Sequence, residues 1–175
     1  TGVQTCALPI SNFAREKNIP YLGICFGFQL AAVSFARNVC NHIDANSTEI
    51  ESETNNPIID LLPEQDGVTD MGGSLRLGAN EINVKPDTIA NRIYGQTKIS
   101  KRHRHRYEFN TKYLDEFAQK GMIFSGESDN GRRMEILEIP DHRFFVGVQF
   151  HPEFNSRPGY PENVFKAFTT AANQN

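Results

Sequence analysis

The sequence predicts an α/β domain built on a mostly parallel, open sheet flanked by helices, with a cysteine at a tight strand-to-helix turn. An apolar run over residues 19–24 stops at Cys25, and helical apolar spacing follows over residues 29–39. Alternating segments typical of strands recur further along, and a helical pattern closes the chain. Strands and helices mixed in this way are typical of a sheet covered by helices.

Each element is predicted from its own local pattern. Residues 12–17 have the character of the last turns of a helix, residues 18–20 form a loop, and a strand and a helix then meet at Cys25. Further along we expect a strand or single turn at 57–61, a glycine-bounded strand or lid at 71–78, a short helix at 87–94, strands at 121–126, 133–139 and 145–150, and a helix at 163–172.

Composition limits the classes of protein to which this chain can belong. With 175 residues and 38% hydrophobic content, it is long enough for one domain with a sizeable core. A net charge of -3 leaves no general electrostatic footprint for nucleic acid, and no apolar run reaches transmembrane length. The three cysteines are widely spaced, which indicates a reducing, cytoplasmic setting rather than a disulfide scaffold. No His/Cys cluster has the spacing of metal ligands, so we expect no metal site.

The most informative stretch surrounds Cys25, in Tyr-Leu-Gly-Ile-Cys-Phe-Gly at residues 21–27. Gly-x-nucleophile-x-Gly is the pattern of a nucleophile elbow. We expect glycine at both flanking positions, Gly23 and Gly27, because neighbouring backbone crowds such a turn and a Cβ would clash there. A strained apex would expose the sulfur and aim the first amides of the helix at a reacting carbonyl. The alternative for a free cysteine is a small buried hydrophobic residue.

A second segment supplies what a cysteine nucleophile needs. The strand at 145–150 ends in His151-Pro152-Glu153. A nucleophilic thiol needs a base, and the base needs a group that holds its tautomer. Because His151 and Glu153 are two residues apart in an extended segment, their side chains lie on the same side of it. Alone, His151 would be an ordinary loop histidine; together with Cys25 it predicts a Cys-His-Glu triad.

A dense basic run, Lys-Arg-His-Arg-His-Arg-Tyr-Glu-Phe, occupies residues 101–109. A solvated basic patch or a nucleic-acid contact is the simpler interpretation, but one short run in an acidic protein favours a local site. In an extended segment Arg102, Arg104 and Arg106 share one face, and His103 and His105 share the other. Arginines held in this way suggest recognition of an anion such as a carboxylate or phosphate.

Taken together, these segments resemble the class I (triad) glutamine amidotransferase domains. Residues 44–49, 72–78 and 102–110 are further similar to the C-terminal glutaminase domain of the CTP synthase family, and the resemblance covers about residues 12–172. It implies hydrolysis of the side-chain amide of L-glutamine by Cys25, His151 and Glu153. It also implies that the glutamine is held by Phe26, Gly27, Phe28, Gln29, Glu49 and Arg106.

The same resemblance implies partners that lie outside this domain. The domain itself would need no cofactor. In the full-length enzyme, a homo-oligomer expected to be a tetramer, ammonia would pass to an N-terminal synthetase domain. That domain would use ATP and Mg²⁺ to aminate UTP to CTP, with GTP as the allosteric activator. No nucleic-acid or membrane partner is expected.

The first residues depart from the family pattern. Family members carry a Pro-Gly-Gly-Phe-Gly segment before the elbow that supplies a second oxyanion donor, and the residues before Cys25 contain no Gly-Gly. We therefore expect residues 1–11 to be a segment unlike the family, and residues 12–175 to be a glutaminase domain lacking one or more strands and half of its oxyanion hole. An inactive fragment, an assembly or regulatory domain, and another triad glutamine amidotransferase stay open as alternatives.

Overall fold

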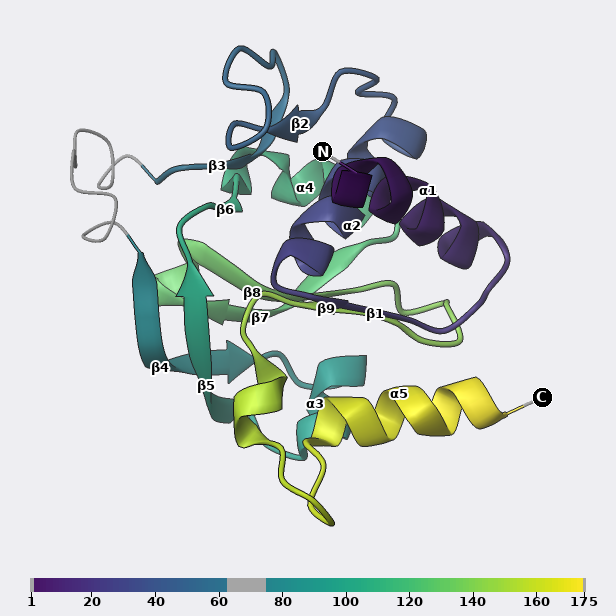
Figure 1. The fold of residues 1–175 in the computed structure, drawn as a ribbon, viewed down its shortest axis with the longest axis vertical. Coiled ribbons are helices and arrows are strands. Elements are labelled where there is room, and N and C mark those ends of the chain that lie inside the picture. The colour runs from purple at the N-terminus through teal and green to yellow at the C-terminus, as the bar shows by residue number, and fades with distance from the viewer. Residues whose placement is uncertain (1, 63–74, 175) are drawn as a thin grey trace.

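The computed structural model describes residues 2–62 and 75–174, and Figure 1 shows helices on both faces of a central sheet. Across these residues the sheet has six strands in the order β1-β9-β8-β7-β4-β5, and a smaller sheet has the order β2-β3-β6. The strands are β1 (Tyr21–Ile24), β2 (Asn46–Ser47), β3 (Pro57–Asp60), β4 (Arg76–Val84), β5 (Lys98–His105), β6 (Glu108–Phe109), β7 (Ile123–Ser128), β8 (Arg133–Glu138) and β9 (Phe145–Val148). The α-helices are α1 (Gly2–Glu16), α2 (Phe26–Asn38), α3 (Ile89–Tyr94), α4 (Leu114–Gln119) and α5 (Asn163–Asn173).

The large sheet is mixed. Among the described strands of this sheet, β1 and β9 run parallel, and every other neighbouring pair is antiparallel. The α/β class and the strand-to-helix turn at Cys25 are confirmed, but the prediction of a mostly parallel sheet is wrong for the described residues. Short connections explain the difference: residues 129–132 link β7 to β8, and residues 139–144 link β8 to β9. Links this short join antiparallel neighbours, whereas a parallel pair needs a long crossover.

Two apolar cores lie on the two faces of the sheet. Helices α1, α2 and α4 and the small sheet cover one face, and α3 and α5 cover the other (Figure 1). Side chains on neighbouring strand positions enter opposite cores, so Leu137 joins the α2 side while Ile136 joins the α5 side. No described helix has both the length and the apolar character that crossing a membrane requires.

Helix α2 lies very close to the sheet, over a pair of glycines. Gly23 of β1 and Gly147 of β9 are opposite each other in the parallel ladder. A Cβ on Gly23 would be 2.7 Å from the Gly27 backbone, and one on Gly147 would be 2.9 Å from the Leu137 side chain and 3.2 Å from the ring of Phe28. A Cβ on Gly27 itself would meet only the Tyr21 hydroxyl, at 3.9 Å. The expected steric need for glycine on both sides of Cys25 therefore holds only at Gly23.

Most predicted elements are present, with shifted ends. The helix predicted to end near residue 17 is α1, which begins at Gly2, and the strand predicted at 145–150 ends earlier, at Val148. The long strand β4 and the helix α4 were not predicted. In the predicted strand or lid at 71–78, residues 71–74 lie outside the described residues, and the rest contributes the start of β4.

Replacing Gly23 with Ala is expected to destabilise the domain by about 1–3 kcal/mol, because a methyl group would be forced against packed backbone. Gly27→Ala is the matched control on the other side of Cys25, and its free energy of unfolding should stay within about 1 kcal/mol of the parent. Urea unfolding followed by circular dichroism measures both variants. Equal losses in the two variants would show that the glycine pair does not set how close α2 lies.

Candidate active site

Cys25 sits at the strained apex between β1 and α2. Its backbone has φ 49° and ψ -101°, a conformation that residues other than glycine seldom adopt. The Cys25 backbone N–H donates to the Val148 carbonyl of β9 at 2.8 Å, which ties the apex to the neighbouring strand. Strain of this kind persists only where its surroundings hold it, and it is concentrated at functional sites.

His151 and Glu153 lie beyond the end of the parallel neighbour, β9. The His151 backbone N–H donates to the Arg102 carbonyl of β5 at 2.9 Å, and Pro152 then starts a short 3₁₀ helix that carries Glu153. The imidazole Nδ1 lies 2.7 Å from a Glu153 carboxylate oxygen, so Nδ1–H donates and the second ring nitrogen, Nε2, is left as the acceptor. This Nε2 is buried and has no hydrogen-bond partner among the described residues.

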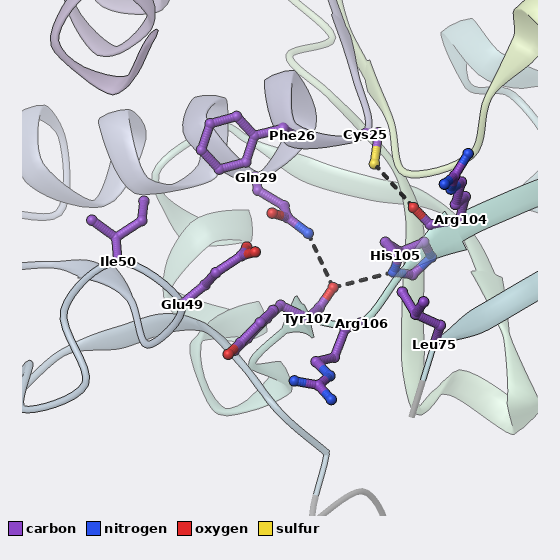
Figure 2. A pocket seen from close by; sticks show the side chains of 10 residues that line it. All are labelled: Cys25, Phe26, Gln29, Glu49, Ile50, Leu75, Arg104, His105, Arg106 and Tyr107. Carbon is purple, nitrogen blue, oxygen red and sulfur yellow. Dashed lines mark hydrogen bonds between the residues drawn. The ribbon is translucent and has the colours of Figure 1, made fainter. Parts of the chain in front are cut away.

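An open pocket of about 1090 Å³ lies in front of the Cys25 sulfur. Figure 2 shows Cys25 and Phe26 on the elbow side and Glu49, Tyr107 and Arg106 across from them. The pocket is lined by Cys25, Phe26, Gln29, Glu49, Ile50, Leu75, Arg104, His105, Arg106 and Tyr107.

The pocket brings together four of the six residues predicted to bind substrate: Phe26, Gln29, Glu49 and Arg106. The other two, Gly27 and Phe28, are not among its lining residues. The Phe28 side chain is fully buried in the core between α2 and the sheet. The Gly27 carbonyl accepts a hydrogen bond from the Tyr21 hydroxyl at 2.9 Å.

Within β5 the basic run divides between two faces as predicted, whereas Arg106 lies just past the end of the strand. Arg102 and Arg104 lie toward solvent on β5, while His103 and His105 are 2% and 5% exposed. The buried histidines lie against two carboxylates: His103 is 3.6 Å from Glu135, and His105 is 3.7 Å from Glu108. The histidine face of β5 therefore belongs to the interior, where His105 also lines the pocket.

Gln149 also contacts Cys25, although the sequence did not mark it as a site residue. It is fully buried just past the end of β9, and its side-chain Nε2 lies 3.8 Å from the Cys25 sulfur. A polar amide inside the otherwise apolar segment 145–150 was the signal that could have identified it.

The surroundings of the sulfur favour the protonated thiol. Burial raises the pKa of Cys25 to about 11, and the negative charges of Glu153 and Glu49 act in the same direction. Hydrogen bonds from the Phe26 backbone N–H and from Gln149 act in the opposite direction, because they favour the thiolate. Chemistry by this sulfur therefore requires a base that removes its proton.

Comparison with known proteins places a chain that carries this elbow, histidine-carboxylate pair and pocket in a known class. The chain matches the model of the family "Glutamine amidotransferase class-I" over residues 3–171, so it belongs to the class I glutamine amidotransferases. Within that class it is similar to CTP synthases. It is 56% identical over 160 residues to the CTP synthase of Archaeoglobus fulgidus and 54% identical over 160 residues to that of Staphylococcus saprophyticus.

Both matches cover 91% of this chain but only 30% of the relatives, so the chain spans less than a third of their length. Among solved structures, the glutaminase domain of Trypanosoma brucei CTPS with bound acivicin has a TM-score of 0.89 and 35% identity, covering 95% of this chain and 64% of that one. A glutamine amidotransferase from Thermotoga maritima, with a TM-score of 0.54 and 15% identity over 93% of this chain and 52% of that one, shares the fold alone.

Because the pKa of Cys25 is raised to about 11, its alkylation by neutral iodoacetamide should accelerate about tenfold per pH unit from pH 7 to about 10, without a plateau. The rate is measured by peptide mass spectrometry. The exposed Cys6 in the same chain serves as the internal reference. A plateau near neutral pH would mean that the thiolate already forms in the resting site.

Proposed function

We propose that this domain hydrolyses the side-chain amide of L-glutamine to glutamate and ammonia, with Cys25 as the nucleophile. The observation that carries the proposal is that the segments following β1 and β9 lie next to each other at one edge of the sheet. The strained thiol and the His151-Glu153 pair lie beyond the same ends of the parallel strands β1 and β9, where the Cys25 N–H bonds to Val148. Family membership and the glutaminase-domain structure that the chain resembles support the same assignment.

In the proposed mechanism, the Nε2 of His151 accepts the thiol proton as the sulfur attacks the amide carbon. Glu153 accepts the Nδ1–H bond and stabilises the imidazolium. The tetrahedral intermediate collapses when the imidazolium protonates its amide nitrogen, which leaves as ammonia, and a γ-glutamyl thioester remains. Water, deprotonated by His151, then attacks the thioester and releases glutamate and the thiol.

The carbonyl oxygen carries negative charge in both tetrahedral intermediates. We assign one donor for this oxyanion to the Phe26 backbone N–H, which already points at the sulfur from the start of α2. As a further proposal, the second donor comes from a Gly-Gly segment that family members carry before the elbow. Losing one such donor costs about 10²–10³ in rate.

Substrate binding is assigned to opposite charges on the pocket wall. The Glu49 carboxylate suits the α-ammonium of glutamine, and the Arg106 guanidinium suits its α-carboxylate as a planar fork. Phe26 and Gln29 also line the pocket and would contact the substrate between these charges and the sulfur. Gly27 and Phe28 would contribute only through the backbone turn that they help to build.

For the longer protein we propose ATP-dependent amination of UTP to CTP, by analogy with the CTP synthases that this chain resembles. The ammonia released here would serve a synthetase domain outside this chain, in a cytoplasmic tetramer. ATP, Mg²⁺, UTP and allosteric GTP are assigned to the full-length enzyme, and no cofactor is assigned to this domain. Among the described residues, no group of three or more His, Cys, Asp or Glu side chains could hold a metal ion. A domain kept for assembly or regulation is the competing proposal.

Glutamate release should fall by about 10⁴-fold or more in Cys25→Ala and in His151→Ala, because neither nucleophile nor base can be replaced by its neighbours. Cys6→Ser changes an exposed thiol and should behave like the parent. The assay is run on this chain and on a version extended N-terminally through a Gly-Gly segment. If the extended version releases no glutamate, the assembly domain is the better proposal. If the short chain already equals it, the second donor lies elsewhere.

Glu49→Gln and Arg106→Lys are each expected to raise the KM for glutamine about tenfold or more, because each loses a charge-assisted hydrogen bond to the substrate. The controls are Glu51→Gln, in the same loop but outside the pocket, and the exposed Arg92→Lys on α3. Initial-rate kinetics separate KM from kcat. A KM that does not change in either pocket variant would remove these residues from the substrate site.

A further inference from the structure

Gln149 links the nucleophile to the elbow helix through one buried amide. Its Nε2 lies 3.8 Å from the Cys25 sulfur, and its Oε1 accepts from the Gln29 side-chain Nε2 at 3.3 Å. Its backbone N–H donates to the Glu135 carbonyl of β8 at 2.9 Å. Gln149 is 0% exposed, so its side-chain amide has no access to solvent, and contacts at both of its ends hold it.

The direction in which this amide points follows from a neighbouring carbonyl. The Tyr107 backbone oxygen can only accept, and Gln29 Nε2 donates to it at 3.0 Å. The second hydrogen of that Nε2 is then directed at Gln149, which must present its oxygen. The Gln149 NH₂ group is consequently the end that faces the Cys25 sulfur (Figure 2 shows the Gln29–Tyr107 contact).

The same carbonyl also fixes the protons of the two buried histidines. His105 Nδ1 lies 3.2 Å from the Tyr107 oxygen and must donate to it, so His105 Nε2 accepts from His103 Nδ1 at 3.2 Å. Burial and the nearby positive charge of Arg76 lower the pKa of His105 to about 3 and that of His103 to about 2. Both rings are therefore neutral at physiological pH, and the hydrogen-bond pattern around Tyr107 does not reverse there.

We propose that Gln149 is a positioning residue for the nucleophile: its fixed N–H donates to the Cys25 sulfur, orients it toward the pocket, and stabilises the thiolate as the proton leaves. The inference rests on the proposed role of Cys25 as the nucleophile. A neutral donor suits this place, because it favours the thiolate without adding a charge that would compete with His151 for the proton. Among the described residues, the other charged or titratable groups that line the pocket or act on the sulfur are Glu49, Arg104, His105, Arg106 and Glu153, and His151 is bonded to Glu153.

Two variants at this position separate donation from packing. Gln149→Met keeps a side chain of similar length without a donor, and Gln149→Glu keeps the shape but turns an ionised or acceptor oxygen toward the sulfur. The control is Gln119→Glu, the same change at an exposed position on α4. Thermal unfolding by circular dichroism identifies variants that retain the native fold.

The first readout is the alkylation of Cys25 by iodoacetamide as a function of pH, measured by mass spectrometry. In folded Gln149→Met the rate at about pH 8 should fall about tenfold, the loss expected for one hydrogen bond to a charged group, and the profile should move up by about one pH unit. Gln149→Glu should fall further, and Gln119→Glu should match the parent. A folded Gln149→Met variant with the parent profile would overturn the proposal.

Two further measurements keep the outcomes distinct. In the parent chain labelled with ¹⁵N, the side-chain amide of Gln149 should shift as Cys25 is titrated or alkylated. An amide that does not respond overturns the proposal even if both variants fail to fold.

In glutaminase assays the Gln149 variants should lose kcat with little change in KM. Glutamate release that survives Cys25→Ala would count against the proposed function, whereas the alkylation profile tests the Gln149 contact independently.

Discussion

The site depends on how closely α2 can approach the sheet, and a pair of glycines sets that distance. Gly23 and Gly147 face each other across the parallel pair β1 and β9 of the large sheet. Because neither carries a Cβ, the first turn of α2 packs directly against β1, and Phe28 packs against β9. The close approach leaves the chain no room for a gradual bend, so the turn between β1 and α2 is taken by the single strained residue Cys25.

The parallel pairing explains why Cys25 and His151 emerge at the same edge of the sheet. Parallel strands end at the same edge of a sheet, so the residues that follow β1 and β9 emerge side by side. Cys25 is the first residue past β1, and His151 follows β9 after Gln149 and Phe150. The antiparallel strands β8, β7 and β4 lie between β9 and β5 in the strand order. The β5 backbone nevertheless contacts the segment after β9, because the Arg102 carbonyl accepts a hydrogen bond from the His151 N–H.

Beneath the pocket, buried charge is balanced by partners rather than by solvent. Arg133 bonds Glu108 at 2.6 Å, Arg76 bonds Glu135, and the neutral His103 and His105 lie against the two carboxylates. Burial and the neighbouring Glu135 still raise the pKa of Glu108 to about 7. The ion pairs hold β4, β8 and β6 together near the Tyr107 carbonyl. Hydrogen bonds connect this carbonyl through the Gln29 amide to Gln149 and then to the Cys25 sulfur. Losing one partner of such a pair would leave a buried charge unpaired, which is costly.

Local chemistry was enough to predict several parts of this protein. The Gly-x-Cys-x-Gly turn, the His151-Glu153 pair and the two faces of the basic run follow from turn sterics and from the two-residue period of extended chain. The strand directions did not follow, because they depend on which strands pair, and β4 carries no pattern of its own strong enough to show that it lies between β5 and β7. The packing of α2 against β1 and β9 likewise decided three features that the sequence did not show. These are the need for Gly23 but not Gly27, the burial of Phe28, and the contact of Gln149 with Cys25. The sequence by itself determined which chemical groups are present and which of them lie at turns or strand ends. The tertiary structure decided which of these groups are in contact, because contacts between distant segments arise from packing and are not encoded in any local period.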